Sequence, residues 1–270
     1  NIICSNGGDD LLTIAIRSFC DQLGPLACLG PTYSLYPVLA SIQDTPYVEV
    51  PFAENFGIPA QLGNTGAALT IVCNPNAPSG SYIPKEKLAE LAGQLEGILL
   101  IDEAYVDFAE DNCISLINDF DNVIILRSLS KGYSLAGLRF GFGIACKSLI
   151  NGMRKVKDSY NTDAVSIAAA TEAIKDRDQF RQNVEMIKQQ RHYLSEELSK
   201  LGLKVYPSSS NFVLVEHKQA GSIYEQLVDR HIYVRYFSNL KGMQDKLRIT
   251  VGTAEQVQAL ISALKEILSK

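Results

Sequence analysis

Short apolar runs alternate with amphipathic segments over roughly the first 150 residues of the chain. The apolar runs are rich in leucine, isoleucine and valine, as expected of strands buried on both faces of a parallel sheet. They predict strands at Leu26–Leu29, Tyr47–Val50, Ala68–Cys73, Ile98–Ile101, Asn122–Leu126 and Phe140–Ala145. The segments between them predict helices at Asp9–Asp21, Tyr36–Ile42 and Lys85–Leu95, the last with Pro84 in its first turn. This order is typical of an α/β unit with a mostly parallel sheet.

The pattern changes in the second half of the chain. From about Val165 to Lys200 the spacing is continuously helical, and short strands follow at Lys204–Val205, Phe212–Val215, Tyr233–Val234 and Leu247–Thr250, with a helix between. A final helix has one apolar face, with Thr253 as a suitable N-cap. We therefore predict a large domain at 1–155, a helical region at 156–200 and a smaller C-terminal α+β domain at 201–270.

Composition narrows the classes of function. The 270 residues include 25 basic and 30 acidic side chains, for a net charge of -5, which disfavours nucleic acid and anionic membrane surfaces as partners. No apolar run is long enough to span a membrane. Six cysteines without C-x-x-C pairs indicate a reduced, cytoplasmic protein. The three histidines lack metal-ligand spacing, so we expect no metal site.

The first residues are unusual for the start of a chain. Asn1 to Cys4 resembles a buried strand, with no initiator methionine before it. We expect the sequence to be a piece that lacks its natural N-terminal segment.

One lysine lies among groups that suit a phosphate. Ser128 and Ser130 precede Lys131, and Arg139 follows eight residues later. Hydroxyls and a guanidinium bind phosphate through charge-assisted hydrogen bonds, whereas a lysine with a lowered pKa can form a Schiff base. Together these groups suggest pyridoxal 5'-phosphate. Ser-x-Ser-Lys also occurs in ordinary polar turns, so other segments have to decide between the two interpretations.

Three further segments fit a ligand at the ends of the strands. Asp102 ends a predicted strand, where open α/β sheets bind their ligands, and Tyr105 follows three residues later. Gly8 and Asp9 precede a predicted helix, whose free N–H groups attract anions. Asn76 lies in a turn rich in proline and asparagine. Taken singly, these residues could equally be helix caps or structural turns.

These motifs together resemble the fold-type I pyridoxal phosphate enzymes, and among them the histidinol-phosphate aminotransferase family. The resemblance rests on Ser128 to Lys131 with Arg139, and on Asp102 to Tyr105. It implies a seven-stranded large domain and a cofactor bonded to Lys131. It further implies that Asp102 pairs with the pyridinium nitrogen and Tyr105 with the phenolic oxygen of the cofactor.

The resemblance implies roles for the other candidates. The cofactor phosphate would be held by Ser128, Ser130, Arg139 and the backbone of Gly8 and Asp9. Tyr33, in Pro31 to Tyr36, matches the aromatic residue that stacks on the pyridine ring. In the C-terminal part, Arg248 matches the arginine that binds the α-carboxylate, Arg235 the one that contacts the substrate phosphate, and Asn211 a residue of the carboxylate site. A surface salt bridge is the alternative explanation for either arginine.

The chain also departs from the family pattern. Ala77 stands where many relatives have the asparagine that bonds the phenolic oxygen, so Asn76 is the candidate to replace it, and Ser79 stands for a threonine. Gly-Gly-Asp-Asp replaces the commoner Gly-Ser-Asp-Glu before the first helix. The family's N-terminal arm, which completes the substrate pocket and reaches the partner subunit, has no counterpart here.

The activity implied is a ping-pong transamination between histidinol phosphate and 2-oxoglutarate, in a homodimer with small-molecule substrates. A threonine-phosphate decarboxylase and an aromatic or broad-specificity aminotransferase are the enzyme alternatives. A regulatory protein that only binds pyridoxal phosphate is a third; such proteins usually add a DNA-binding domain, and the net charge and the lack of a basic recognition helix disfavour it. The sequence before Asn1 could still contain such a domain.

Overall fold

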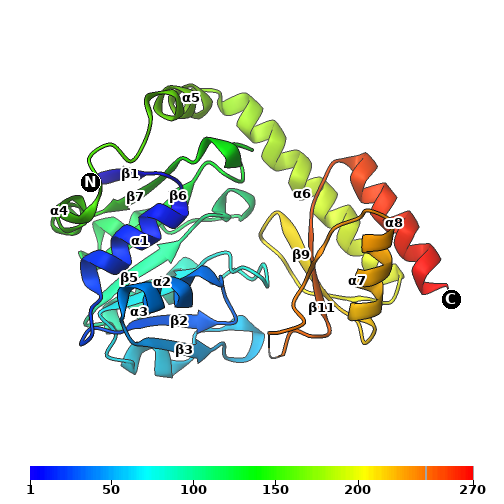
Figure 1. Ribbon diagram of the computed structural model, residues 1–270, viewed down its shortest axis with the longest axis horizontal. Helices are drawn as coiled ribbons and strands as arrows, with labels where there is room; N and C mark the ends of the chain where they lie inside the picture. Colours follow the sequence, from blue (N-terminus) through cyan, green and yellow to red (C-terminus); the bar gives the residue numbers. More distant parts are fainter. Residues whose placement is uncertain (241, 270) are drawn as a thin grey trace.

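Two sheets organise the computed structural model, which describes residues 1–240 and 242–269 (Figure 1). The first sheet has seven strands in the order β1-β7-β6-β5-β4-β2-β3. Its strands are β1 (Ile2–Ser5), β2 (Leu26–Gly30), β3 (Tyr47–Pro51), β4 (Leu69–Cys73), β5 (Ile98–Asp102), β6 (Val123–Ser128) and β7 (Gly141–Ala145). The five strands from β3 to β6 run parallel, and β7 lies antiparallel between β6 and β1. The predicted mostly parallel α/β sheet is confirmed.

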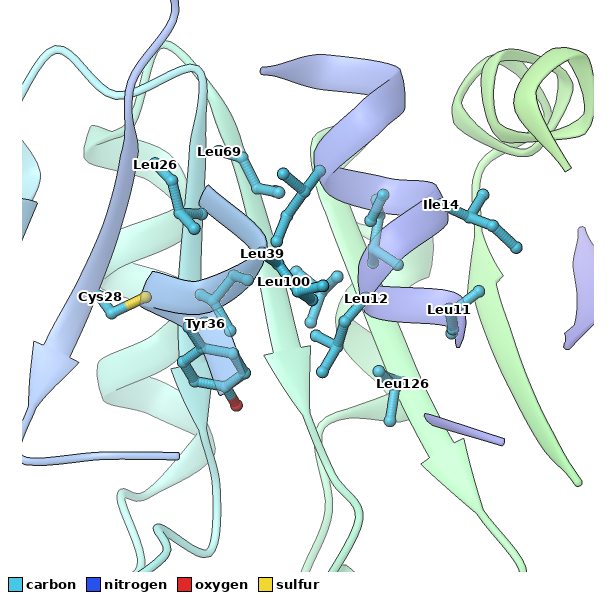
Figure 2. Close-up of a cluster of buried hydrophobic side chains, with 14 of the residues drawn as sticks. Leu11, Leu12, Ile14, Leu26, Cys28, Tyr36, Leu39, Leu69, Leu100 and Leu126 are labelled. Atoms are coloured by element: carbon cyan, nitrogen blue, oxygen red, sulfur yellow. The ribbon is translucent and has the colours of Figure 1, made fainter. Parts of the chain in front are cut away.

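Helices cover both faces of this sheet. On one face lie α1 (Gly8–Phe19), α2 (Leu35–Gln43) and α4 (Lys147–Val156), and on the other lies α3 (Lys85–Gln94). Figure 2 shows the first interface, in which Leu11 and Leu12 of α1 and Leu39 of α2 meet side chains of the strands. Every position of β2 and β4 is buried, which explains why these strands are apolar without alternation.

Short 3₁₀ helices connect the larger elements of the first unit. They span Glu54–Phe56, Ala60–Asn64, Val106–Phe108, Ile114–Asn118 and Ala136–Leu138. Two of them follow β5 and β6 closely, so they shape the loops at the carboxyl ends of these strands. The sequence did not predict them, because one turn of 3₁₀ helix has no apolar period of its own.

The second sheet has four antiparallel strands in the order β10-β11-β9-β8. They are β8 (Lys204–Val205), β9 (Phe212–Glu216), β10 (Arg235–Tyr236) and β11 (Lys246–Thr250). One face packs against α6 (Arg177–Lys200), α7 (Ala220–Asp229) and α8 (Ala254–Leu268), and α5 (Ala164–Lys175) precedes α6. Thr253 caps α8 as predicted, in a capping box with Gln256. The domain boundaries at 1–155, 156–200 and 201–270 remain our proposal.

Three details differ from the predictions. The helix expected from Val165 to Lys200 is two helices, because Asp176 ends α5 and its carboxylate accepts the Gln179 N–H at the start of α6. The strand expected at Tyr233–Val234 is wrong: pairing begins at Arg235, opposite Arg248. Val234 packs against the second core without pairing, whereas Tyr233 is 74% exposed. Pro84 is the N-cap of α3 and lies just before its first turn.

Polar contacts connect the two units near the carboxyl ends of the first sheet. Arg191 of α6 donates to the carbonyl oxygens of Ser210, at 2.7 Å, and Phe108. The Ser209 N–H donates to the Gly80 carbonyl oxygen at 2.8 Å. Gly80 has φ of 78°, and a Cβ there would lie 2.3 Å from Ser208 Oγ, so glycine is required for this approach. None of the helices in the described part of the chain is both long and apolar enough to cross a membrane.

The capping box of α8 provides a test of the second unit. We expect Thr253→Ala to lower the free energy of unfolding by about 1 kcal/mol, because the Gln256 N–H loses its acceptor. Urea unfolding followed by circular dichroism measures the change. Thr171→Ala is the control, since Thr171 lies exposed in the interior of α5 and caps nothing. An equal loss in both variants would contradict the assignment.

Candidate active site

The register of three parallel strands creates the site. Cys73 of β4 lies beside Asp102 of β5, which lies beside Leu126 of β6. A cavity of about 270 Å³ opens where these strands end. Ten of the predicted site residues line it: Gly8, Asp9, Tyr33, Asp102, Tyr105, Ser128, Ser130, Lys131, Arg139 and Arg248. Residues from distant parts of the sequence therefore meet at one point, as open α/β sheets predict.

Asp102 provides a buried carboxylate on the floor of the cavity. Its side chain is only 4% exposed. One oxygen accepts the Tyr36 O–H at 2.8 Å, and the other accepts the Ala104 N–H at 3.0 Å. Burial raises the pKa of this carboxyl, and the two hydrogen bonds oppose the rise because they favour the ionised form. Asp102 is thus fixed in orientation and stabilised as an acceptor.

Lys131 lies in the loop after β6, across the cavity. Its Nζ lies 5.3 Å from the centre of the Tyr105 ring. Burial lowers the pKa of this amine, and the positive charge of Arg248 lowers it further. Both effects favour the neutral amine, which is the form that reacts with a carbonyl carbon.

Donors for an anion gather at the start of α1. Ser128 Oγ and Ser130 Oγ lie 2.9 Å apart, and Arg139 Nη2 lies 3.7 Å from Asp9. Gly7 is the N-cap of α1, and no side chain of the described residues caps this helix end. A Cβ on Gly7, whose φ is 85°, would lie 2.4 Å from Arg139 Nη2. Glycine thus lets the guanidinium approach the helix terminus, where N–H groups and positive dipole favour anions.

Two tyrosines flank this space. Tyr33 donates its hydroxyl to Asp9 at 3.2 Å, and its pKa is raised to about 12, mainly by burial. Tyr105 packs edge-on against Phe212 of the second sheet, and burial also raises its pKa. Both phenols therefore stay protonated near neutral pH and can act as hydrogen-bond donors.

A second cavity of about 600 Å³ adjoins the first. Tyr33, Ala77 and Arg248 line both cavities, and Arg235 lines only the second. Arg248 lies over the Phe212 ring, 5.0 Å from its centre, and its Nε is buried without a hydrogen-bond partner among the described residues. Because a buried donor without a partner is costly and Arg248 lines both cavities, its guanidinium suits an anionic ligand.

Two predicted residues are not brought to these cavities. Asn76 is 1% exposed, and its amide contacts Thr32, Pro31 and Ser79, so it is absent from the cavity lining that Ala77 joins. Its amide instead joins its own turn to the segment of Pro31 and Thr32, and the role of Asn76 as a replacement for the missing asparagine stays a prediction. Asn211 lies at the start of β9 beside Phe212, outside both linings.

Other contributors escaped the sequence analysis. Tyr36 bonds to Asp102, and its only signal in the sequence was its place in the predicted helix close to Tyr33. Glu103 is fully buried and accepts the Arg127 Nε–H at 2.7 Å and the Cys113 N–H at 2.5 Å. This bridge links β5 to the residue just before Ser128, and it steadies the loop that carries Lys131.

No cluster of candidate metal ligands exists among the residues that the structure describes.

The position of Arg248 leads to a prediction about Lys131. We expect Arg248→Gln to raise the pKa of Lys131, because a neighbouring positive charge is removed, so the neutral amine appears only at higher pH. Competitive acylation of Lys131 as a function of pH, followed by mass spectrometry, measures this change. Arg235→Gln removes the same charge from the adjoining cavity and is the control. Equal titration of Lys131 in wild type and Arg248→Gln would disprove the coupling.

Comparisons with known proteins agree with this geometry. The family model described as "Aminotransferase class I and II" matches residues 1–264. A histidinol-phosphate aminotransferase of a Nostoc species is 44% identical over 99% of this chain and 76% of its own length, and one of a Geobacter species is 40% identical over 98% and 76%.

Solved structures give the same result. The histidinol-phosphate aminotransferase of Sinorhizobium meliloti, determined in complex with pyridoxal 5'-phosphate, is 26% identical with a TM-score of 0.92, over 100% of this chain and 77% of that one. A threonine-phosphate decarboxylase of Porphyromonas gingivalis is 22% identical with a TM-score of 0.88, over 100% of this chain and 84% of its own, and shares the fold. The chain belongs to the class I and II aminotransferases, and within them to the histidinol-phosphate aminotransferase family.

Proposed function

We propose that this chain is a pyridoxal 5'-phosphate-dependent aminotransferase that transfers the amino group between histidinol phosphate and 2-oxoglutarate. Its relatives at 37 to 44% identity bear the name of that activity. The observation that carries the proposal is the pairing, in one cavity, of a lysine with a lowered pKa and a buried carboxylate. Sequence reasoning and the comparisons arrive at this enzyme class independently.

The donor set of the cavity fits the cofactor. Ser128, Ser130, Arg139 and the N-terminus of α1 would hold its phosphate, since they provide hydroxyls, a guanidinium and N–H groups. Asp102, which lines the same cavity, would bind the ring nitrogen. The unsatisfied Arg248 Nε and the uncapped helix terminus both match a site built for anions.

The cofactor, when bound, supplies an electron sink for the electron pair left at the substrate α-carbon. The protein's residues supply the rest. Lys131 Nζ, whose pKa is lowered by burial and by Arg248, would accept the proton from the α-carbon and later return it. Tyr33, just before α2, lines the site, and Tyr105 provides a phenol that remains protonated.

Substrate binding belongs to the second sheet in this proposal. Arg248 lies between the two cavities and would bind a carboxylate, for which its fork is well shaped. Arg235 is exposed in the larger cavity and would contact the substrate phosphate. β10 and β11 hold these two arginines directly opposite each other. Asn211, directly before β9 and next to Phe212, would assist the carboxylate site from outside its lining.

We also propose that the protein is a homodimer in the cytoplasm. Val38 and Ile42 of α2 are 50% and 75% exposed, which supports contact with a second copy. All six cysteines are free, and four of them are buried, which supports a reduced compartment. Sedimentation velocity of the purified chain tests the dimer.

Covalent trapping tests the role of Lys131. Borohydride treatment of the chain with pyridoxal 5'-phosphate should attach the cofactor to Lys131, and Lys131→Ala should lose both the adduct and roughly 10²–10⁴-fold of the transamination rate. Peptide mapping locates the adduct. An adduct that persists in Lys131→Ala would show that another amine binds the cofactor. Release of carbon dioxide without any 2-oxo acid would identify a decarboxylase.

Substrate choice is tested at Arg235. We expect Arg235→Gln to lower kcat/KM for histidinol phosphate by about 10- to 100-fold, because a charge-assisted hydrogen bond is lost. The glutamate half-reaction should change little. Arg230→Gln, at the end of α7, removes the same charge elsewhere in the second unit and serves as the control. Equal losses for both amino donors would contradict a phosphate role for Arg235.

A further inference from the structure

Tyr36 is the one fully buried phenol that contacts the candidate site. It lies in the first turn of α2, and its side chain is 0% exposed. Figure 2 shows its ring among the side chains of the core, close to Cys28 and Leu39. A phenylalanine would fill that space equally well. The packing of the ring therefore leaves the hydroxyl unexplained.

The hydroxyl has a carboxylate acceptor and also lies near the Cys73 thiol. Tyr36 Oη donates to Asp102 Oδ2 at 2.8 Å, across 66 residues of sequence. A buried hydroxyl without an acceptor would cost about 1–3 kcal/mol, so the pair is strongly constrained. Burial and the neighbouring Asp102 charge raise the pKa of Tyr36 well above its ordinary value. Its proton therefore stays on the phenol, and Tyr36 is a permanent donor to the carboxylate.

The contact with Tyr36 affects both the orientation and the ionisation of the Asp102 carboxyl. The Ala104 N–H occupies one oxygen and the Tyr36 O–H the other, yet each oxygen retains a further lone pair. Both donors favour the ionised carboxylate against the burial that opposes it. They also fix its rotation, since a carboxylate held at both oxygens cannot turn freely. Asp102 thus reaches the cavity with a fixed orientation, and its two donors favour its ionised form.

We propose that Tyr36 is a positioning residue that keeps Asp102 ionised and aimed at the cofactor's ring nitrogen, and so determines how firmly that nitrogen is held protonated. This inference rests on the proposed function. Tyr36 itself touches no cofactor or substrate. It acts through Asp102 alone.

The inference makes a selective prediction about ligand binding. Tyr36→Phe keeps the ring and removes the donor, so the affinity for pyridoxal 5'-phosphate should fall by about tenfold. The affinity for the 1-deaza analogue, which has C–H in place of the ring nitrogen, should stay within about twofold of the wild-type value. Equilibrium dialysis of the 270-residue chain with each compound measures both constants.

Tyr47→Phe is the matched control. Tyr47 packs against the same core and donates its hydroxyl to a carboxylate, that of Glu49, at 3.1 Å. Its loss should affect both compounds equally or neither. A second comparison uses Asp102→Asn: adding Tyr36→Phe to this variant should weaken pyridoxal phosphate binding no further, because the residue through which Tyr36 acts is already changed. Thermal unfolding of each variant checks that it is folded.

The outcomes separate the two proposals. Equal weakening of both compounds by Tyr36→Phe, or no weakening of either, would overturn the role of Tyr36 while leaving the enzyme assignment intact. Wild-type chain that binds neither compound would instead overturn the proposed function, and this inference with it. Selective loss of the nitrogen-bearing compound in Tyr36→Phe, absent from Tyr47→Phe, supports the inference.

Discussion

The parallel pairing of β4, β5 and β6 is the constraint on which the site depends. Because the carboxyl ends of parallel strands meet at one edge, Cys73, Asp102 and Leu126 stand side by side, and the loops beyond them share one cavity. A slip of one residue in β5 would turn Asp102 toward the opposite face of the sheet. The apolar strands that secure the core therefore also secure the chemistry.

Burial shifts the two principal ionisable groups of the cavity toward their neutral forms. The raised pKa of Asp102 and the lowered pKa of Lys131 both have desolvation as their largest cause. The neighbours act differently at the two groups: hydrogen bonds from Tyr36 and Ala104 favour the anion at Asp102. At Lys131, Arg248 reinforces the neutral amine, while the charges of Asp9 and Asp102 oppose it. Within one buried cavity, Asp102 is therefore an oriented acceptor and Lys131 a candidate nucleophile.

Sequence reasoning recovered what local patterns encode. The strands of the first sheet followed from apolar runs, and ten site residues followed from motifs whose spacing is itself chemical. It failed where tertiary contacts decide. The Asn76 amide also bonds to Pro31 and Thr32, the break at Asp176 depends on a cap, and the Tyr36 bond joins segments 66 residues apart. No period or spacing encodes such contacts, because they exist only after the units pack.

A row of contacting side chains crosses from one sheet to the other: Lys131, Tyr105, Phe212 and Arg248. The positive charge that helps to lower the pKa of Lys131 therefore belongs to Arg248 of the second sheet. If the second sheet moved away from the first, the lysine would become more basic and more fully protonated, and the amine would lose its nucleophilic form. The reactivity of Lys131 therefore depends on the second sheet lying against the first.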